Sequence, residues 1–255
     1  MGDSIRLEVC VDSVASAMAA ERGGAYAVEL CSDLAEGGTT PSAGQIAMVR
    51  KRIGIELRVL IRPRAGDFFY SSDEFNVMCR DILLAKQLGA DGLALGILDV
   101  DGNVDSARTA ELVQLARPLR VTFHRAFDMT RNPDKSLESV VQTGCDRVLT
   151  SGAAKTAMEG IEPIGHLVKA AKDRIRIVAA GGIREDNVRE IVERTGVREI
   201  HAALQAPEPS PMRYRNEPTT MGTSPGVEYQ RSLVHSGAVE RLIQVAGEPV
   251  PATKA

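Results

Sequence analysis

Short apolar runs alternate along the chain with longer segments of helical periodicity. Four of the runs begin with an aliphatic residue, an arginine and a second aliphatic residue, and four others follow a glycine placed to end a helix. This alternation is typical of a parallel sheet whose strands are joined by helices. The predicted strands are residues 5–10, 24–31, 57–62, 89–96, 119–124, 144–151, 175–180 and 196–203.

Eight strand–helix units in 255 residues predict one (β/α)8 TIM barrel, in the α/β class, spanning residues 1–255. A doubly wound open sheet is the competing fold. The alternation between odd and even strands favours the closed barrel, whose interior layers draw on alternate strands. Residues 205–236 are expected to form a long irregular loop that is a lid, an oligomer contact or a partly disordered segment. Residues 248–255 are expected to be a flexible tail.

Capping residues mark several predicted helix starts. Ser71 with Glu74 has the spacing of a capping box, and Asn132 precedes Pro133. Asp12 is the expected cap of the first helix.

The alternation of side chains along each strand predicts which residues face the barrel axis. The outer face of the barrel must be apolar because helices cover it, so Leu7, Val9 and Val121 face outward. Their neighbours then face inward, and the polar and thiol-bearing members of that set are Glu8, Cys10, Glu29, Cys31, Arg58, Arg62, Thr122, His124 and His201.

Position along the strand separates functional candidates from structural ones, because TIM-barrel active sites are built at the carboxyl ends of the strands. The inward side chains nearest those ends are Cys10, Cys31, Arg62, His124 and His201. The arginines that begin strands belong to the amino-terminal mouth, where charge is expected to serve stability: Arg6, Arg58, Arg120 and Arg176.

The buried carboxylates Glu8 and Glu29 need partners, because an isolated buried charge is costly. Arg58 and Arg62 are the expected partners, which would make an internal ion-pair network. Alternatively, the carboxylates join His124 in an acid/base site.

The loops at the carboxyl ends of the strands carry specific motifs. They are ELCSDLAEGGTTPSAG from Glu29, RPRAGDFFYSSDE from Arg62, FHRAFDMTRNP from Phe123 and LTSG from Leu149. In combination these stretches resemble the CutC family of copper homeostasis proteins, and the resemblance covers nearly the whole chain. The sequence departs from the family pattern at Ala153, where a second glycine is usual, and at Ala180, in place of a richer glycine run.

The resemblance implies copper handling, and Cu(I) prefers thiolate, thioether and imidazole ligands. Cys10 and Cys31 are the expected metal ligands, because they point inward from adjacent strands about 4.8 Å apart. The alternative is that each is a small buried residue, as cysteine often is.

An enzyme acting on a small anionic or sugar-like metabolite is the competing function. Its expected catalytic residues are Glu8, Glu29, His124 and His201. Its expected substrate-binding residues are Arg62, Arg64, Asp67, Arg125, Asp128, Ser151, Gly181 and Gly182. No complete Ser-His-Asp, metalloprotease or Walker pattern points to a named reaction. A metal-independent binding or structural protein is the third alternative.

Charge and composition narrow the partners. The net charge is −3, with 31 basic and 34 acidic residues interspersed and 4% aromatic residues, so neither a nucleic acid nor a membrane is an expected partner. No leader-like or bilayer-spanning apolar run is present, so a cytoplasmic protein is expected. Four widely spaced cysteines indicate neither a disulfide framework nor a Cys-x-x-Cys zinc site. A homodimer or homotetramer is expected.

Overall fold

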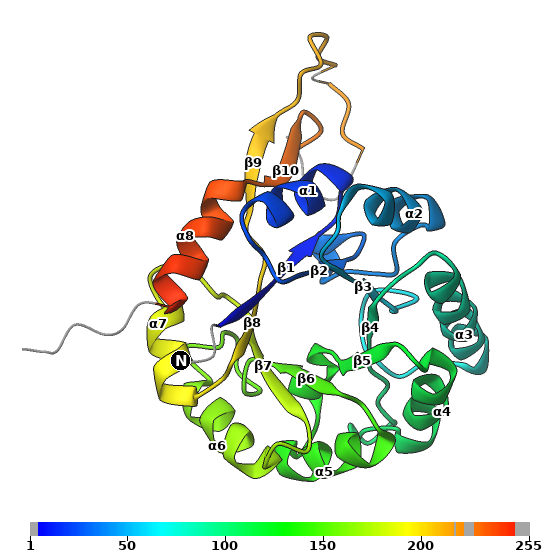
Figure 1. Cartoon of the computed structure of the whole chain (residues 1–255). Helices are drawn as coiled ribbons and strands as arrows, with labels where there is room; N and C mark the ends of the chain where they lie inside the picture. The colour runs from blue at the N-terminus through cyan, green and yellow to red at the C-terminus, as the bar shows by residue number, and fades with distance from the viewer. Residues whose placement is uncertain (1–4, 217, 222–226, 248–255) are drawn as a thin grey trace, which may run out of the picture.

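The computed structural model describes residues 5–216, 218–221 and 227–247, so the predicted tail at 248–255 lies outside the described residues. Eight parallel strands close into a barrel, with β1 paired to both β2 and β8 (Figure 1). The TIM-barrel prediction is confirmed. The barrel strands are β1 Arg6–Val11, β2 Ala27–Leu30, β3 Glu56–Leu60, β4 Gly92–Leu95, β5 Arg120–Phe123, β6 Arg147–Thr150, β7 Arg176–Ala180 and β8 Glu199–Ala202.

Helices form a ring outside the strands (Figure 1). They are α1 Val14–Arg22, α2 Ala43–Arg52, α3 Ser72–Gln87, α4 Ser106–Ala116, α5 Pro133–Thr143, α6 Ile161–Ala171, α7 Val188–Thr195 and α8 Ser236–Gly247. Two 3-10 helices, η1 Leu34–Glu36 and η2 Arg125–Met129, follow β2 and β5. Within the described ranges, no helix combines the length and apolarity needed to cross a bilayer.

Local capping explains where the helices begin. The Ser71–Glu74 capping box is confirmed, and the Asn132 side chain accepts a hydrogen bond from the backbone N–H of Lys135. The prediction for Asp12 is wrong. Helix α1 is capped by Ser13, because the strand continues to Val11 and the helix starts one residue later than expected.

The core lies mainly between the barrel and the helices, as the alternation predicts. Leu7, Val9 and Val121 belong to this large cluster and are almost fully buried. Two small clusters fill the barrel interior instead, and they consist of Cys10, Cys31, Leu60 and Ala94 on one side and Leu149, Val178 and Ala180 on the other. The predicted inward register is therefore confirmed, and it places the polar side chains on the barrel axis.

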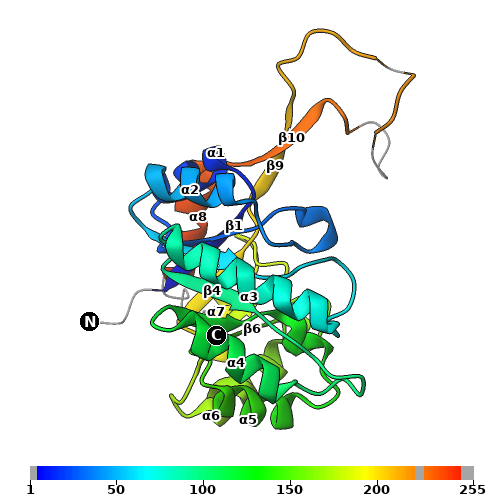
Figure 2. The same ribbon diagram turned by 90° about the vertical axis from the view of Figure 1, so that its right-hand side faces the viewer.

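The segment after β8 is not irregular throughout, in contrast to the prediction. Strands β9 (Gln205–Pro209) and β10 (Gln230–Val234) pair in antiparallel fashion and form an arm. The arm extends outward beyond the ring of helices in both views (Figures 1 and 2). None of its described residues lines the cavity at the carboxyl ends of the strands, so the arrangement gives no support to a lid. Self-association as a homodimer or homotetramer stays a prediction.

Candidate metal centre

A cavity of about 320 Å³ opens at the carboxyl ends of the strands. Its lining brings together eight of the predicted site residues, namely Cys10, Glu29, Cys31, Arg62, His124, Arg125, Asp128 and His201. Gly37, Leu60, Phe68, Met129 and Leu149 complete the wall. The candidate residues on β1, β2 and β8 thus converge with the loops after β3 and β5.

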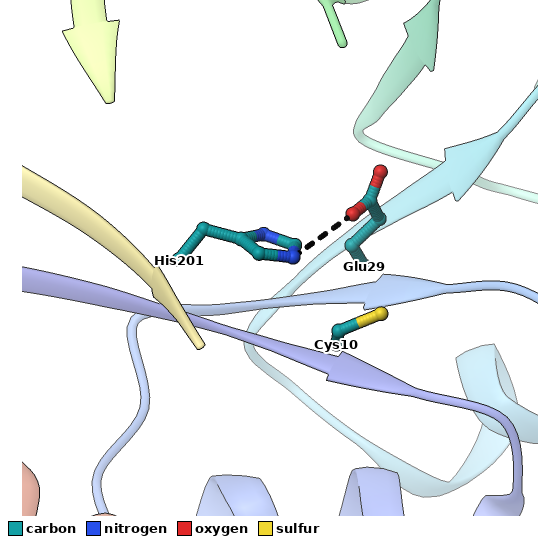
Figure 3. Close-up of side chains that lie close together, drawn as sticks. All are labelled: Cys10, Glu29 and His201. Atoms are coloured by element: carbon teal, nitrogen blue, oxygen red, sulfur yellow. Dashed lines mark ion pairs between the residues drawn. The ribbon is translucent and has the colours of Figure 1, made fainter. Parts of the chain in front are cut away.

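Three potential metal ligands meet on one side of this cavity (Figure 3). The donor atoms of Cys10, Glu29 and His201 all lie within 4.8 Å of one another. Strand pairing explains the convergence, because Cys10 on β1 stands opposite Glu29 on β2. The Nε2 atom of His201 reaches across from β8 to within 3.4 Å of a Glu29 carboxylate oxygen.

Cys31 adds a second thiol beside this group. Because the register places Glu29 opposite Cys10, Cys31 lies diagonally across from Cys10 and not directly opposite it. The two Sγ atoms are nevertheless 3.5 Å apart. Both side chains are buried, and the Cys31 thiol also donates to the carbonyl oxygen of Val11. The cavity wall therefore offers two adjacent thiols, an imidazole and a carboxylate.

Glu8 lies behind His201 and orients its ring. The Glu8 carboxylate accepts a hydrogen bond of 2.8 Å from Nδ1 of His201, which directs Nε2 towards Glu29 and the cavity. Glu8 also accepts from Arg58 and, at 3.0 Å, from Arg147. Burial opposes the charge on Glu8, but Arg147 and Arg58 hold its pKa well below the ordinary value. A carboxylate behind a ligating histidine is the usual arrangement that fixes the tautomer at a metal site.

The expected ion-pair network is therefore confirmed in part. Arg58 pairs with Glu8, as predicted. Arg62 does not pair with either buried glutamate, because its guanidinium donates to the backbone carbonyls of Glu36, Gly38 and Gly66. The second cation on Glu8 is Arg147, which sequence reasoning missed. Its place on β6 two residues before inward-facing Leu149 is the signal that would have found it.

Burial and neighbours shift the pKa values of the ligand group. Burial raises the pKa of Glu29 against the lowering effect of His201. Burial lowers the pKa of His201, but Glu29 and Glu8 outweigh this, and the net shift is upward. The hydrogen bond to Cys31 and burial raise the pKa of the Cys10 thiol well above its ordinary value. Without a cation the group therefore holds protons that a metal would displace.

His124 stands apart from the ligand group on the same cavity wall. Its Nδ1 accepts a hydrogen bond from the backbone N–H of Ala126, and its buried Nε2 has no hydrogen-bond partner among the described residues. The His124 ring packs 5.1 Å from that of Phe68. Burial and the nearby Arg62 cation lower the pKa of His124 from 6.5 to about 3. The imidazole is therefore neutral at physiological pH.

This shift predicts that His124 makes the fold sensitive to acid. Below pH 6.5 the unfolded chain protonates this histidine and the folded chain does not, so stability falls until the pH approaches 3. When the pH is lowered from 7.5 to 5, wild type should lose about 2 kcal/mol more unfolding free energy than His124→Asn does. Asparagine retains a capping oxygen. Urea unfolding at both pH values measures the difference.

His166→Asn is the matched control, because His166 is exposed. The difference in unfolding free energy between wild type and His166→Asn should change by less than about 0.5 kcal/mol between pH 7.5 and pH 5. Parallel pH curves for wild type and His124→Asn would contradict a neutral buried imidazole.

The remaining predicted binding residues divide into two groups. Arg125 lines the cavity, and its side chain donates to Asp128 at 2.7 Å and to Ser151 at 2.8 Å. Gly181 lies against both Arg125 and Ser151. The other residues lie off the cavity wall. Arg64, in the loop after β3, pairs with Asp67 of the same loop and with Glu74 of α3. Gly182 lies beside Thr156.

Comparison with known proteins decides the family. A sequence model of the CutC family matches residues 5–206. The chain belongs to the CutC family. Relatives named copper homeostasis protein cutC homolog, from Mus musculus and Homo sapiens, are each 49% identical over 223 and 218 residues. These alignments cover 88% and 86% of this chain and 82% and 80% of the relatives. A CutC family protein of Chromobacterium violaceum is 45% identical over 92% of this chain and 96% of its own length.

One solved structure agrees with this assignment to the CutC family, and a second shows the fold. A protein named CutC from Streptococcus agalactiae superposes with a TM-score of 0.73 at 35% identity, over 77% of this chain and 97% of its own. Phosphoribosylanthranilate isomerase from Pyrococcus furiosus, at 13% identity, has a TM-score of 0.58 over 95% of this chain and 98% of its own, and shows the fold alone. Ala153 has a φ of 58°. That left-handed conformation is one that glycine adopts at lower cost.

Proposed function

We propose that this protein binds Cu(I) in the cavity at the carboxyl ends of its strands, through Cys10 and Cys31. The observation that supports this most strongly is the 3.5 Å separation of the two buried Sγ atoms. His201 contributes an imidazole nitrogen within 4.8 Å of the Cys10 sulfur. Thiolate and imidazole are the ligands that Cu(I) prefers. The names of the mouse and human relatives, which refer to copper homeostasis, agree with this ligand set.

The spacing of the donors is compatible with one ion. A thiolate–metal bond is about 2.3 Å long for zinc, so two thiolates on a single ion lie no more than about 4.6 Å apart. The separation of 3.5 Å between the two Sγ atoms falls inside this limit. Glu8 supplies the carboxylate that holds Nδ1 of His201 and leaves Nε2 for the cation. The protein as a whole would act in the cytoplasm, where thiols stay reduced.

Anaerobic titration with Cu(I) against a chromophoric chelator tests the proposal. We expect one Cu(I) ion per chain, with X-ray absorption dominated by sulfur neighbours and a smaller nitrogen contribution from His201. A copper complex with only oxygen and nitrogen neighbours, or no binding in competition, would contradict it. Zinc titrated under the same conditions is the comparison, because a site with two thiols, an imidazole and a carboxylate offers zinc four ligands. Tighter binding of zinc than of Cu(I) would overturn the choice of metal.

A second candidate function is acid/base chemistry on a small anionic or sugar-like metabolite in the same cavity. The observation that favours it is the unpartnered, buried Nε2 of His124 on the cavity wall, near the Arg125–Asp128 pair. A neutral imidazole at pH 7 can accept a proton from a substrate. A thermal-shift screen of metabolites against wild type and His124→Asn separates the two functions. A metabolite that stabilises only the wild type would favour the enzyme.

A further inference from the structure

A second cavity, of about 510 Å³, lies at the amino-terminal end of the barrel, opposite the proposed copper site. Its charged lining is dominated by six arginines, which are Arg6, Arg58, Arg120, Arg147, Arg174 and Arg176. Three acidic residues, Asp146, Asp173 and Glu199, also line it. Three further carboxylates contact its arginines from outside the lining, namely Glu8, Glu56 and Glu138. Several cations facing one concave space make a strong local positive potential.

The acidic residues do not offset this potential fully. Glu199 is the central carboxylate, and it contacts Arg147 at 3.0 Å, Arg176 at 3.7 Å and Arg6 at 3.9 Å. One carboxylate thus serves three guanidinium groups. Asp146 is paired at 3.0 Å with Arg117, which does not line the cavity. Arg58 and Arg174 are paired with carboxylates outside the lining. The arginines with the least carboxylate contact are therefore Arg6 and Arg176, which share Glu199 at the longer distances, and Arg120.

Two arginines in this cavity have guanidinium nitrogens that no carboxylate of the described residues contacts. The side chain of Arg147 is only 4% exposed, and its Nη2 has no hydrogen-bond partner among the described residues. Leaving a buried charged donor unsatisfied is costly, so such a donor commonly marks the position of a missing ligand. Arg120 is exposed at the start of β5 and has no ion-pair partner in the part of the chain that the structure describes.

We propose that this cavity binds a small polyanion that carries phosphate groups. Guanidinium groups match phosphate oxygens in a forked, charge-assisted geometry. The volume of about 510 Å³ is within the range of small-molecule sites and exceeds what a single phosphate would fill. Because Arg6 on β1, Arg120 on β5, Arg147 on β6 and Arg176 on β7 converge here, a ligand with several charges satisfies more of them than a monoanion does. The proposal does not depend on copper binding.

Calorimetric titration with tripolyphosphate at about 50 and 200 mM salt tests this site. We expect saturable binding that weakens as salt rises. Arg120→Gln should lower the affinity about tenfold, and Arg120→Lys should lower it less, because lysine keeps the charge and loses the fork. Arg176→Gln, at a half-exposed position, should act like Arg120→Gln.

Arg80→Gln is the matched control. Arg80 is exposed on α3, so this substitution removes the same charge outside the cavity. The affinity of Arg80→Gln for tripolyphosphate should stay within about twofold of the wild-type affinity. Absence of binding at millimolar tripolyphosphate would overturn the proposal, as would equal losses in Arg120→Gln and Arg80→Gln. Citrate, titrated in parallel, tests the ligand class. Binding of citrate as tight as that of tripolyphosphate would overturn the assignment to phosphate.

Discussion

Replacing Cys10 or Cys31 with serine is expected to weaken Cu(I) binding about 100-fold in each case. Each variant leaves only one sulfur where the structure brings two Sγ atoms to 3.5 Å. Structural metal sites with four protein ligands release about 10–16 kcal/mol, or roughly 3 kcal/mol for each ligand, and this corresponds to a factor of about 100 in affinity. Serine keeps the size of the side chain but offers a hard oxygen, which Cu(I) disfavours.

Cys79→Ser is the matched control for the two cavity cysteines. Cys79 lies on α3 and does not line the cavity. The affinity of Cys79→Ser for Cu(I) should therefore stay within about twofold of the wild-type affinity. Anaerobic competition titrations of all three variants give the comparison. Affinities of Cys10→Ser and Cys31→Ser that equal the wild-type value would remove this cavity as the copper site, whatever the stoichiometry of the wild-type protein.

Replacing Glu8 with glutamine is expected to destabilise the fold at pH 7 by about 3–5 kcal/mol. The side chains of Glu8, Arg58 and Arg147 are each no more than 4% exposed. Neutralising the carboxylate therefore leaves each of the two buried cations with one carboxylate in place of two, and it replaces the charged acceptor for Nδ1 of His201 with a neutral one. The Glu56→Gln variant is the control, because Glu56 also contacts Arg58 but is 30% exposed. That variant should lose no more than about 1 kcal/mol.

The pH dependence of this effect has a definite sign. The pKa of Glu8 in the folded protein lies well below its ordinary value of 4.5. Its contribution is therefore fully present above about pH 4.5 and is lost as the pH falls from there towards the folded-state pKa. The difference in unfolding free energy between wild type and Glu8→Gln should narrow between pH 7 and pH 3. A difference below about 1 kcal/mol at pH 7, measured by urea unfolding, would contradict a stabilising role for the buried Glu8 charge.

The sequence by itself determined the architecture and the direction of the strand side chains. Helices cover the outside of the barrel, so only one register buries Leu7 and Val9 against them, and that register turns Glu8 and Cys10 inward. Because parallel strands bring their carboxyl ends to one mouth, the sequence alone assigns Cys31 and His124 to the same cavity. The arm formed by β9 and β10 was not foreseen, since its segment is rich in proline and lacks a clear alternation.

Only the tertiary structure decided which of the inward groups pair with one another. Strand composition does not fix the stagger between neighbouring strands, and this stagger places Cys10 opposite Glu29 and Glu8 opposite His201. It also brings Arg147 across the barrel to Glu8, a contact between residues 139 positions apart. Arg62 turned instead to backbone carbonyls whose positions depend on the path of two loops. Alternation sets the direction of a side chain, whereas closure of the barrel sets its partner.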